Sequence, residues 1–412
     1  MKLLTPPAVY IVDQVLKNPQ ATTRMERVLT RVDCDTVETV ADEQLDGLIQ
    51  EHSWKGSRRR RGNQRHGDPP IVFDTYRFPP DGWQQGDPLP RANRRTLFGT
   101  WHKRDRARIA EKDRVVCQTG YGFHSGFGCL FKCDYCAIED VLGLATNQED
   151  LLERMDPVVR SVNGPTLWKW DNQTDTLCFE PEMGASELFV TYFAQFDDKF
   201  LMTYSKSDNV DHLLDLDHRG QTICCWTLNA STQSRVIERD SATMEARIEA
   251  ARKCQQAGYN VRFRLSAVCP VHNWEQEYRE MFDLLFENVA PDLISLETLS
   301  RMPEPDMFDN VMDASLFEPH YVEAIREGAE EMTGNIWGPL PDDQREAIYR
   351  FLITEIHRRS PDLPVSLCQE PLHMWDRLAD VLDMSPEYYA CCCAKDSVPG
   401  GHPRIKRYEA IG

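Results

Sequence analysis

The chain has 412 residues, of which 41% are hydrophobic and 27% charged, a globular composition that excludes a wholly disordered protein. Its net charge of −19 disfavours non-specific nucleic-acid binding, because an acidic surface repels phosphate. No apolar run is long enough to cross a membrane, and Pro6 and Pro7 interrupt the N-terminal sequence before a signal-peptide core can form. We therefore expect a cytoplasmic protein without membrane contact.

The first hundred or so residues predict one short strand and one long insertion rich in Arg, Pro and Gly. Residues 9–12 predict a short strand, and a mixed helical stretch follows. Residues 53–95 contain a run of arginines at 58–61, many Pro and Gly, and little periodicity, which predicts a long loop or a partly disordered insertion. Residues 51–117 hold 16 Lys and Arg against 8 Asp and Glu. The arginine run is therefore either a solvated arm or an arm that contacts phosphate.

A regular alternation of strands and helices begins at about residue 199. Apolar or alternating runs predict strands at 200–204, 222–228, 261–265 and 292–296. Met244, Ile248 and Ala251 mark one face of an intervening helix, and the helix after it begins at about Trp274. Strands that alternate with helices through short connections are parallel, with right-handed crossovers. We therefore expect an α/β barrel or an open sheet.

The boundaries of the first of these helices are also predictable. Asp240 or Ser241 is a candidate N-cap, because a short polar side chain can accept a hydrogen bond from the first turn. Gly258 is the candidate C-terminal stop.

Three cysteines with metal-ligand spacing precede this series. The chain has 14 cysteines, and without a secretion signal we expect metal or redox chemistry rather than disulfides. Cys129, Cys133 and Cys136 are spaced CxxxCxxC after a glycine-rich approach. Three thiolates on one loop can ligate three irons of a [4Fe–4S] cluster and leave the fourth iron for a substrate or cofactor.

Zinc is the alternative at this loop. A structural zinc site needs four ligands, commonly in CxxC pairs, and Cys117 or His124 could supply the fourth. Only one CxxC is present here, and no second pair follows at zinc-finger spacing, so the spacing favours iron over zinc.

The CxxxCxxC spacing resembles the signature of the radical S-adenosylmethionine (SAM) superfamily. Residues 206–215, Lys-Ser-Asp-Asn-Val-Asp-His-Leu-Leu-Asp, look like a segment of the spore photoproduct lyases within it. Residues 226–229, Trp-Thr-Leu-Asn, are similar to their Phe-Ser-Ile-Asn strand, and residues 250–259, 274–278 and 9–11 also resemble that family. The similarity covers roughly residues 5–50 and 110–300.

The resemblance implies a set of cofactor-binding residues. Cys129, Cys133 and Cys136 would bind the cluster, and SAM would occupy the fourth iron and be cleaved to a 5′-deoxyadenosyl radical. Lys206 matches a family lysine that contacts the SAM carboxylate, and Tyr135 matches an aromatic residue near the adenosyl group. Thr227 and Asn229 match polar SAM contacts at a strand end. Ordinary packing or surface roles are the alternatives for these four residues.

The resemblance also implies a catalytic role for Cys178. The family carries a cysteine at this distance after the cluster motif, followed by a glycine that Gly184 matches here. In the family this thiol returns a hydrogen atom to the product radical. Tyr135 is the second residue to which we assign a catalytic role. A buried structural cysteine is the alternative for Cys178.

Several positions depart from the family pattern. Ala137 stands where the family has a tyrosine, and residues 179–181, Phe-Glu-Pro, replace its Thr-Ser-Asp. Its basic DNA-holding segment is matched by acidic residues 337–343, so the DNA contact is in doubt. The C-terminal region contains Cys368 and the run Cys391, Cys392 and Cys393, which is either an auxiliary metal site or a redox-active or buried set.

We thus expect an α/β protein with a partial (βα) barrel of the radical SAM type over residues 111–300. Residues 1–110 form an N-terminal extension with the arginine-rich insertion, and 301–412 form a C-terminal appendage. The resemblance implies a lyase that cleaves a carbon–carbon bond in a thymine-derived DNA lesion or nucleobase, with flavodoxin or ferredoxin as electron donor. The alternatives are a radical SAM enzyme for a peptide or small molecule, and a non-catalytic zinc or nucleic-acid-binding protein.

Overall fold

The computed structural model describes most of the chain. It covers residues 1–52, 67–78, 115–118, 120–136, 138, 141–300, 308, 311–387 and 389–400, and the backbone of 101–104. The arginine run at 58–61 and Ala137 lie outside the described residues.

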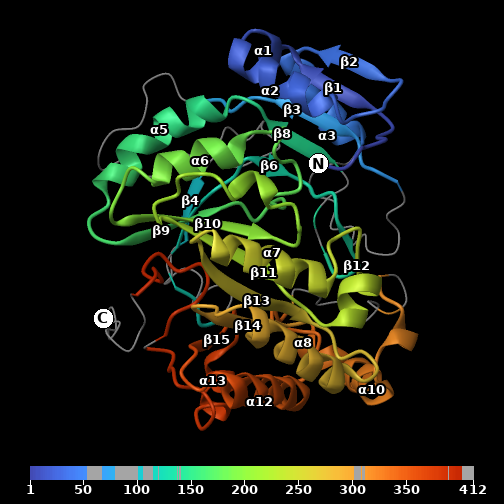
Figure 1. The fold of residues 1–412 in the computed structure, drawn as a ribbon. Helices are drawn as coiled ribbons and strands as arrows, with labels where there is room; N and C mark the ends of the chain where they lie inside the picture. Colours follow the sequence, from blue (N-terminus) through green and yellow to red (C-terminus); the bar gives the residue numbers. More distant parts are fainter. Residues whose placement is uncertain are drawn as a thin grey trace.

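An eight-stranded curled sheet forms the centre of the molecule (Figure 1). Its order is β15-β14-β13-β11-β10-β9-β5-β4, and all neighbours are parallel except the antiparallel pair β4 and β5. The result is the expected partial barrel. The strands are β4 (Trp101–Arg104), β5 (Gly120–Phe123), β9 (Thr166–Trp170), β10 (Lys199–Ser205), β11 (Thr222–Thr227), β13 (Asn260–Val268), β14 (Ile294–Thr298) and β15 (Val365–Leu367).

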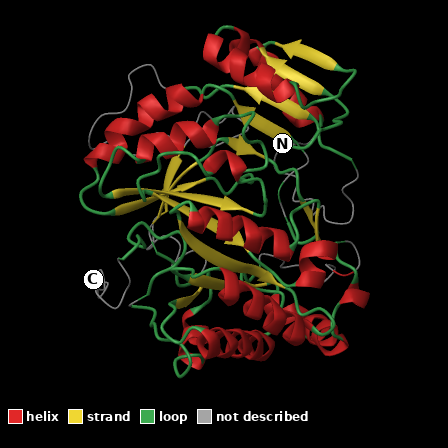
Figure 2. Cartoon of the chain, viewed as in Figure 1, coloured by secondary structure: helices red, strands yellow, loops and turns green. Residues whose placement is uncertain are grey.

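The four strands expected after residue 199 are confirmed as β10, β11, β13 and β14. β11 is buried along its whole length, as expected for a parallel strand covered on both faces. Helices α6 (Ala185–Phe193), α7 (Met244–Gln256), α8 (Trp274–Asn288) and α12 (Asp342–Arg359) connect or follow these strands, and α6, α7 and α12 pack against them (Figure 2).

The N-cap of α7 differs from the expectation. The cap is Thr243, whose Oγ1 accepts a hydrogen bond from the Ala246 N–H at 3.3 Å, and not Asp240 or Ser241. Asp240 has a φ of 62° and follows the short strand β12 (Glu238–Arg239), so the chain turns there before the helix starts. Gly258, with a φ of 97°, lies just beyond the helix end and matches the predicted stop.

A second, five-stranded sheet contains the N-terminal strands in the order β2-β1-β3-β8-β6. β1 (Val9–Val12) lies where a strand was expected. β3 (Ile71–Asp74) lies within the segment expected to be a loop or disordered, so that expectation is wrong for these residues. Its Ile-Val-Phe run is fully buried between β1 and β8, and this burial explains the strand. The others are β2 (Val37–Val40), β6 (Gly126–Phe127) and β8 (Leu142–Ala145).

The remaining elements surround the two sheets. Helices α1 (Asp13–Leu16), α2 (Pro19–Leu29) and α3 (Asp42–Glu51) accompany the N-terminal sheet, and α5 (Gln148–Ser161) follows β8 (Figure 1). The C-terminal region adds α10 (Pro319–Glu327), α11 (Ala329–Met332) and α13 (Leu372–Arg377). No helix in the described part of the chain is long and apolar enough to span a membrane.

The end of the chain closes one side of the half-barrel. In the segment 389–400, the carbonyl of Lys395 accepts a hydrogen bond from Leu167 of β9 at 2.8 Å. The Arg262 guanidinium of β13 donates to the Cys392 carbonyl at 3.1 Å, and Ser295 of β14 accepts from the Cys392 N–H at 3.1 Å. The C-terminal region is therefore part of the same folded unit as the barrel strands.

Candidate active site

The three motif cysteines lie on a loop held between the two sheets. Gly128 has a φ of 85°, and a Cβ there would lie 1.7 Å from the Val141 carbonyl oxygen, so only glycine fits this approach. After the turn, β7 (Lys132–Cys133) pairs with β12 in a small antiparallel ladder. The sulfur atoms of Cys129 and Cys136 accept backbone N–H groups, from Phe131 at 3.4 Å and from Ile138 at 3.5 Å.

These cysteines open into a cavity of 420 Å³ at one end of the barrel strands. The cavity brings together most of the residues expected to bind cofactors, namely Cys129, Cys133, Cys136, Tyr135, Lys206 and Thr227. Burial raises the pKa of the Cys133 thiol to about 12 and raises that of Cys129 further. Uncharged thiols at these positions therefore need a bound cation to become thiolates.

The two residues considered as a fourth zinc ligand lie elsewhere. His124 Nδ1 lies 3.2 Å from a carboxylate oxygen of buried Asp171, outside the cavity lining. Cys117 lies beside the C-terminal cysteines Cys368 and Cys391. Within the described residues, no three His, Cys, Asp or Glu side chains converge as ligands of a single metal ion.

Lys206 follows β10 and is fixed above the Tyr135 ring. Its Nζ lies 5.4 Å from the ring centroid. Burial alone would lower the pKa of Lys206, but the Cys133 thiol and the Glu238 carboxylate raise it above its ordinary value. Lys206 is therefore a permanent cation in the cavity wall next to the cysteine loop.

Glu238, which no sequence motif indicated, contacts several residues next to the cavity. It is fully buried, accepts hydrogen bonds from the Tyr135 hydroxyl and from Asn229 Nδ2 (2.6 Å), and pairs with buried Arg247 at 2.5 Å. Burial opposes ionisation, but Arg247 and Lys206 lower the pKa of Glu238 below its ordinary value. An ionised Glu238 therefore fixes both Tyr135 and Asn229.

Thr227 and Asn229 at the end of β11 have different surroundings. Thr227 lines the cavity and donates from Oγ1 to the Tyr204 hydroxyl at 2.9 Å. Asn229 is fully buried outside the lining, and its amide is engaged by Glu238 and by the Tyr278 hydroxyl, which donates to Oδ1 at 3.1 Å. Asn229 therefore does not face the cavity; it is linked to the cavity residue Tyr135 through Glu238.

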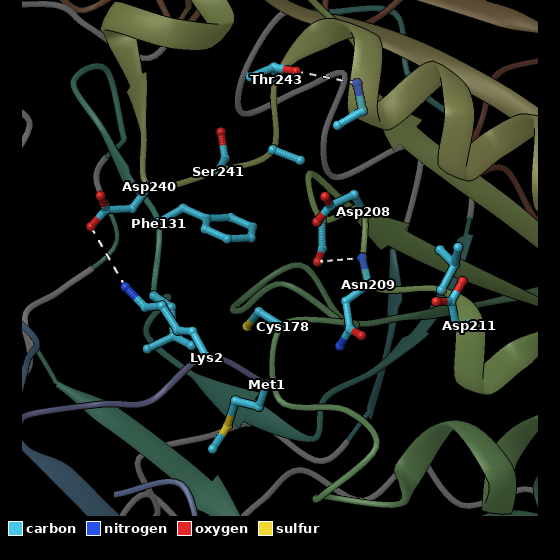
Figure 3. A pocket seen from close by; sticks show the side chains of 15 residues that line it. Met1, Lys2, Phe131, Cys178, Asp208, Asn209, Asp211, Asp240, Ser241 and Thr243 are labelled. Atoms are coloured by element: carbon cyan, nitrogen blue, oxygen red, sulfur yellow. Dashed lines mark hydrogen bonds and ion pairs between the residues drawn. The ribbon is translucent and has the colours of Figure 1, made fainter. Parts of the chain in front are cut away.

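Cys178 lines a second cavity, of 560 Å³ (Figure 3). Its thiol is 6% exposed and donates to the Asp175 carbonyl at 3.4 Å. Burial, together with Asp175 and Cys129, raises the pKa of the Cys178 thiol well above its ordinary value, so it keeps its proton. Phe131 lines both cavities, and Cys129 is close enough to raise the pKa of the Cys178 thiol, so the two cavities adjoin. The structure thus brings Cys178 beside the cysteine loop but not into its cavity.

Four charged residues of the first cavity were also missed, namely Lys169, Asp175, Arg264 and Glu297. Asp175 and Glu297 are carboxylates in its lining, and Arg264 of β13 pairs with Glu297. Glu297 also accepts from the Ser266 hydroxyl at 2.6 Å. The position of Arg264 could have identified it from the sequence. It is a charged residue on a strand whose two faces are both buried, so its side chain must point into the barrel.

Comparison with known proteins shows a similarity to spore photoproduct lyases. The family model described as "Spore photoproduct lyase" matches residues 113–300. The spore photoproduct lyase of Bacillus subtilis is 27% identical over 181 residues, which cover 42% of this chain and 53% of the relative. That of a Geobacillus species is 25% identical over 177 residues, covering 40% and 50%. The chain thus spans about half the length of the curated relatives it matches.

Solved structures agree in fold over a larger part of the chain. A spore photoproduct lyase complexed with a dinucleoside spore photoproduct matches with a TM-score of 0.59 and 16% identity, covering 89% of this chain and 99% of that one. A mutant of the enzyme with bound AdoMet and the same dinucleoside matches with a TM-score of 0.56 and equal coverage. By its matched domain over residues 113–300 and by the fold of its half-barrel, this chain is similar to the spore photoproduct lyases.

Proposed function

We propose that this chain is a radical SAM lyase that repairs a thymine-derived DNA lesion of the spore photoproduct type. The observation that carries the proposal is the 420 Å³ cavity, which joins the three motif cysteines to Lys206, Tyr135 and Thr227. The family match over residues 113–300 supports the reaction class.

The residues at the loop fit an iron–sulfur cluster. Cys129, Cys133 and Cys136 supply three sulfur ligands that open into one cavity, and two of these sulfurs accept backbone N–H groups. Such hydrogen bonds stabilise electron-rich sulfur. Three cysteines leave one iron of a [4Fe–4S] cluster without a cysteine ligand, and SAM would occupy it. When bound, the cluster would supply the electron that cleaves SAM and releases the 5′-deoxyadenosyl radical.

The cavity residues would orient SAM and exclude competing reactions. The Lys206 ammonium is placed to pair with the carboxylate of SAM, and the Tyr135 ring offers an apolar face for the adenosyl group. The Thr227 hydroxyl provides a polar contact. Asn229 is a positioning residue in this proposal, because it holds Glu238 and through it Tyr135.

Cys178 would return a hydrogen atom to the product radical. The thiol is protonated and buried, so its S–H bond is intact at neutral pH. The S–H bond breaks, a C–H bond forms on the product, and an external one-electron donor such as a reduced flavodoxin or ferredoxin, with a proton, restores the thiol. The product must then reach Cys178 from the first cavity, past Phe131, which lines both cavities.

A second candidate is the same radical initiation on a peptide or small molecule. The observation that favours it is the cavity around Cys178, whose lining holds three carboxylates, Asp208, Asp211 and Asp240, against the one cationic side chain of Lys2. Carboxylates at this position repel a phosphodiester and suit a neutral or cationic substrate.

One anaerobic incubation separates these functions. Reconstituted protein, SAM, dithionite and a dinucleoside spore photoproduct should yield 5′-deoxyadenosine together with repaired thymines. Formation of 5′-deoxyadenosine without any thymine would favour the second candidate. If iron-loaded protein formed no 5′-deoxyadenosine from SAM and dithionite, with or without the dinucleoside, that result would contradict radical SAM chemistry.

A further inference from the structure

Four cysteines that are distant in the sequence meet at the C-terminal side of the barrel. They are Cys117, which precedes β5, Cys368, which follows β15, and Cys391 and Cys393 near the end of the described chain. The Cys391 and Cys393 thiols are in hydrogen-bond contact, and both Cys117 and Cys368 are close enough to interact electrostatically with Cys391. Cys368 is likewise close to Cys393 and Cys117.

Hydrogen bonds hold these segments together. The Cys368 N–H donates to the Leu296 carbonyl at 2.8 Å, which extends the β14–β15 ladder to the cysteine. The Val116 N–H donates to the Glu370 carbonyl at 2.8 Å, and Gln118 Nε2 donates to the Tyr389 carbonyl at 2.6 Å. These hydrogen bonds fix the segment of Cys117 relative to those of Cys368 and Cys391.

Cys392 belongs to a different environment, although it lies between two members of the set. Its thiol donates to the Phe263 carbonyl at 3.3 Å and contacts the Cys225 thiol of β11. Residues 392 and 393 lie in a turn, and the Ala394 N–H donates to the Cys391 carbonyl at 3.4 Å. The turn thus brings the Cys391 and Cys393 thiols into contact, while the Cys392 thiol contacts Cys225.

A cation lies next to one of the four thiols, that of Cys368. Arg264 Nη2 donates to the Cys368 sulfur at 3.1 Å and also pairs with Glu297. The same arginine lines the 420 Å³ cavity of the motif cysteines. A sulfur-rich site with a neighbouring guanidinium suits a centre that carries net negative charge through thiolate ligands.

We propose that Cys117, Cys368, Cys391 and Cys393 bind a second iron–sulfur cluster. Four thiolates are the full ligand set of a [4Fe–4S] cluster, and in such a cluster each sulfur binds its own iron. A zinc ion also takes four thiolates, so the metal bound at this set is the result that separates the two occupants. The proposal does not depend on the proposed function, because it concerns a separate set of ligands.

Iron and sulfide analysis of anaerobically reconstituted full-length protein tests the proposal. A variant with Cys129→Ala, Cys133→Ala and Cys136→Ala should keep about half of the wild-type iron and acid-labile sulfide, with an EPR signal that does not respond to SAM. A Cys391→Ser/Cys393→Ser variant should also lose about half, but it should keep the SAM-responsive signal. Cys392→Ala is the matched control and should keep all of the iron.

Two results would overturn the proposal. One is a triple variant at the motif cysteines that binds no iron, which places all the iron at the first site. The other is one zinc ion per chain bound at the second set in place of iron. If the Cys391→Ser/Cys393→Ser variant fails to fold, the triple variant alone decides, because it leaves the second set intact. Loss of the SAM-responsive signal in the triple variant separately tests the first site.

Discussion

Cys178 and Lys206 are held by one carboxylate, that of Asp175. The Cys178 N–H donates to Asp175 Oδ1 at 3.1 Å, and the Lys206 N–H donates to Oδ2 at 2.7 Å. Burial raises the pKa of Asp175, while hydrogen bonds from the backbone and from the Ser205 hydroxyl oppose this rise. The proposed hydrogen donor and the proposed SAM ligand are thus fixed relative to each other, although their side chains face different cavities.

The role of Cys178 predicts a change of products in Cys178→Ala. The variant should bind the cluster and SAM and should still form 5′-deoxyadenosine, because neither depends on the thiol. The product radical, without its donor, should be quenched by solvent species or dithionite, and abnormal products should accumulate. Product analysis by mass spectrometry measures this.

A structural cysteine would behave differently at this position. Its loss would destabilise the fold by about 1 kcal/mol and leave the products unchanged. Cys254→Ala is the control, since this buried cysteine of α7 lines neither cavity. Normal product from Cys178→Ala at an undiminished rate would contradict the hydrogen-donor role.

The sequence predicted the barrel strands because each strand has a local signature. Alternation in β13 and continuous apolar runs in β10 and β11 are visible within a few residues, and so is the spacing of the motif cysteines. The N-cap at Thr243 was missed because three neighbouring residues could each cap the helix, and only the turn at Asp240 selects one.

Features that depend on distant segments could not be read from the sequence. Cys117 was considered a ligand for the motif loop, but its tertiary neighbours are Cys368 and Cys391. Glu238 has no motif of its own, and its importance follows from four side chains that only the fold brings together. Likewise, no local pattern indicates that Phe131 lines both cavities.

Glu238→Gln should be strongly destabilising. The substitution leaves the Arg247 guanidinium buried without its anionic partner, and removing one member of a buried pair costs about 3–5 kcal/mol. Denaturant unfolding measures the loss. Glu249→Gln is the control, because Glu249 lies on the exposed surface of α7, the helix that carries Arg247. This substitution should change the unfolding midpoint little. Equal effects of the two substitutions would show that Glu238 does not organise the site.

The arginine run at 58–61 predicts salt-dependent DNA binding. If these side chains contact phosphates, affinity should fall as salt rises, because binding releases counterions. The slope of log affinity against log salt should then become shallower when all four arginines are replaced by alanine. Fluorescence anisotropy with a labelled duplex measures both. Absence of DNA binding at low salt would favour the peptide or small-molecule substrate.

Glu180 predicts that the protein loses stability as the pH rises towards neutrality. Burial raises the pKa of this carboxyl from its ordinary 4.5 to about 7, against a hydrogen bond from the Ala185 N–H at 3.1 Å. The folded state therefore holds a proton that the unfolded state releases above pH 4.5. The resulting stabilisation is complete below pH 4.5 and is lost as the pH rises through about 7.

Glu180→Gln should remove this contribution, because glutamine is neutral at every pH. The free energy of unfolding, measured in urea at several pH values, should fall less steeply between pH 4.5 and 7 than in the wild type, by at most about 1.4 kcal/mol per pH unit. Part of the slope should remain, since burial also raises the pKa of Glu370 to about 7. Glu249→Gln is again the control: Arg252 lowers the pKa of that surface carboxyl, so its replacement should alter the profile only below pH 4.5. An unchanged slope in Glu180→Gln would mean that Glu180 is ionised in the folded protein throughout this range.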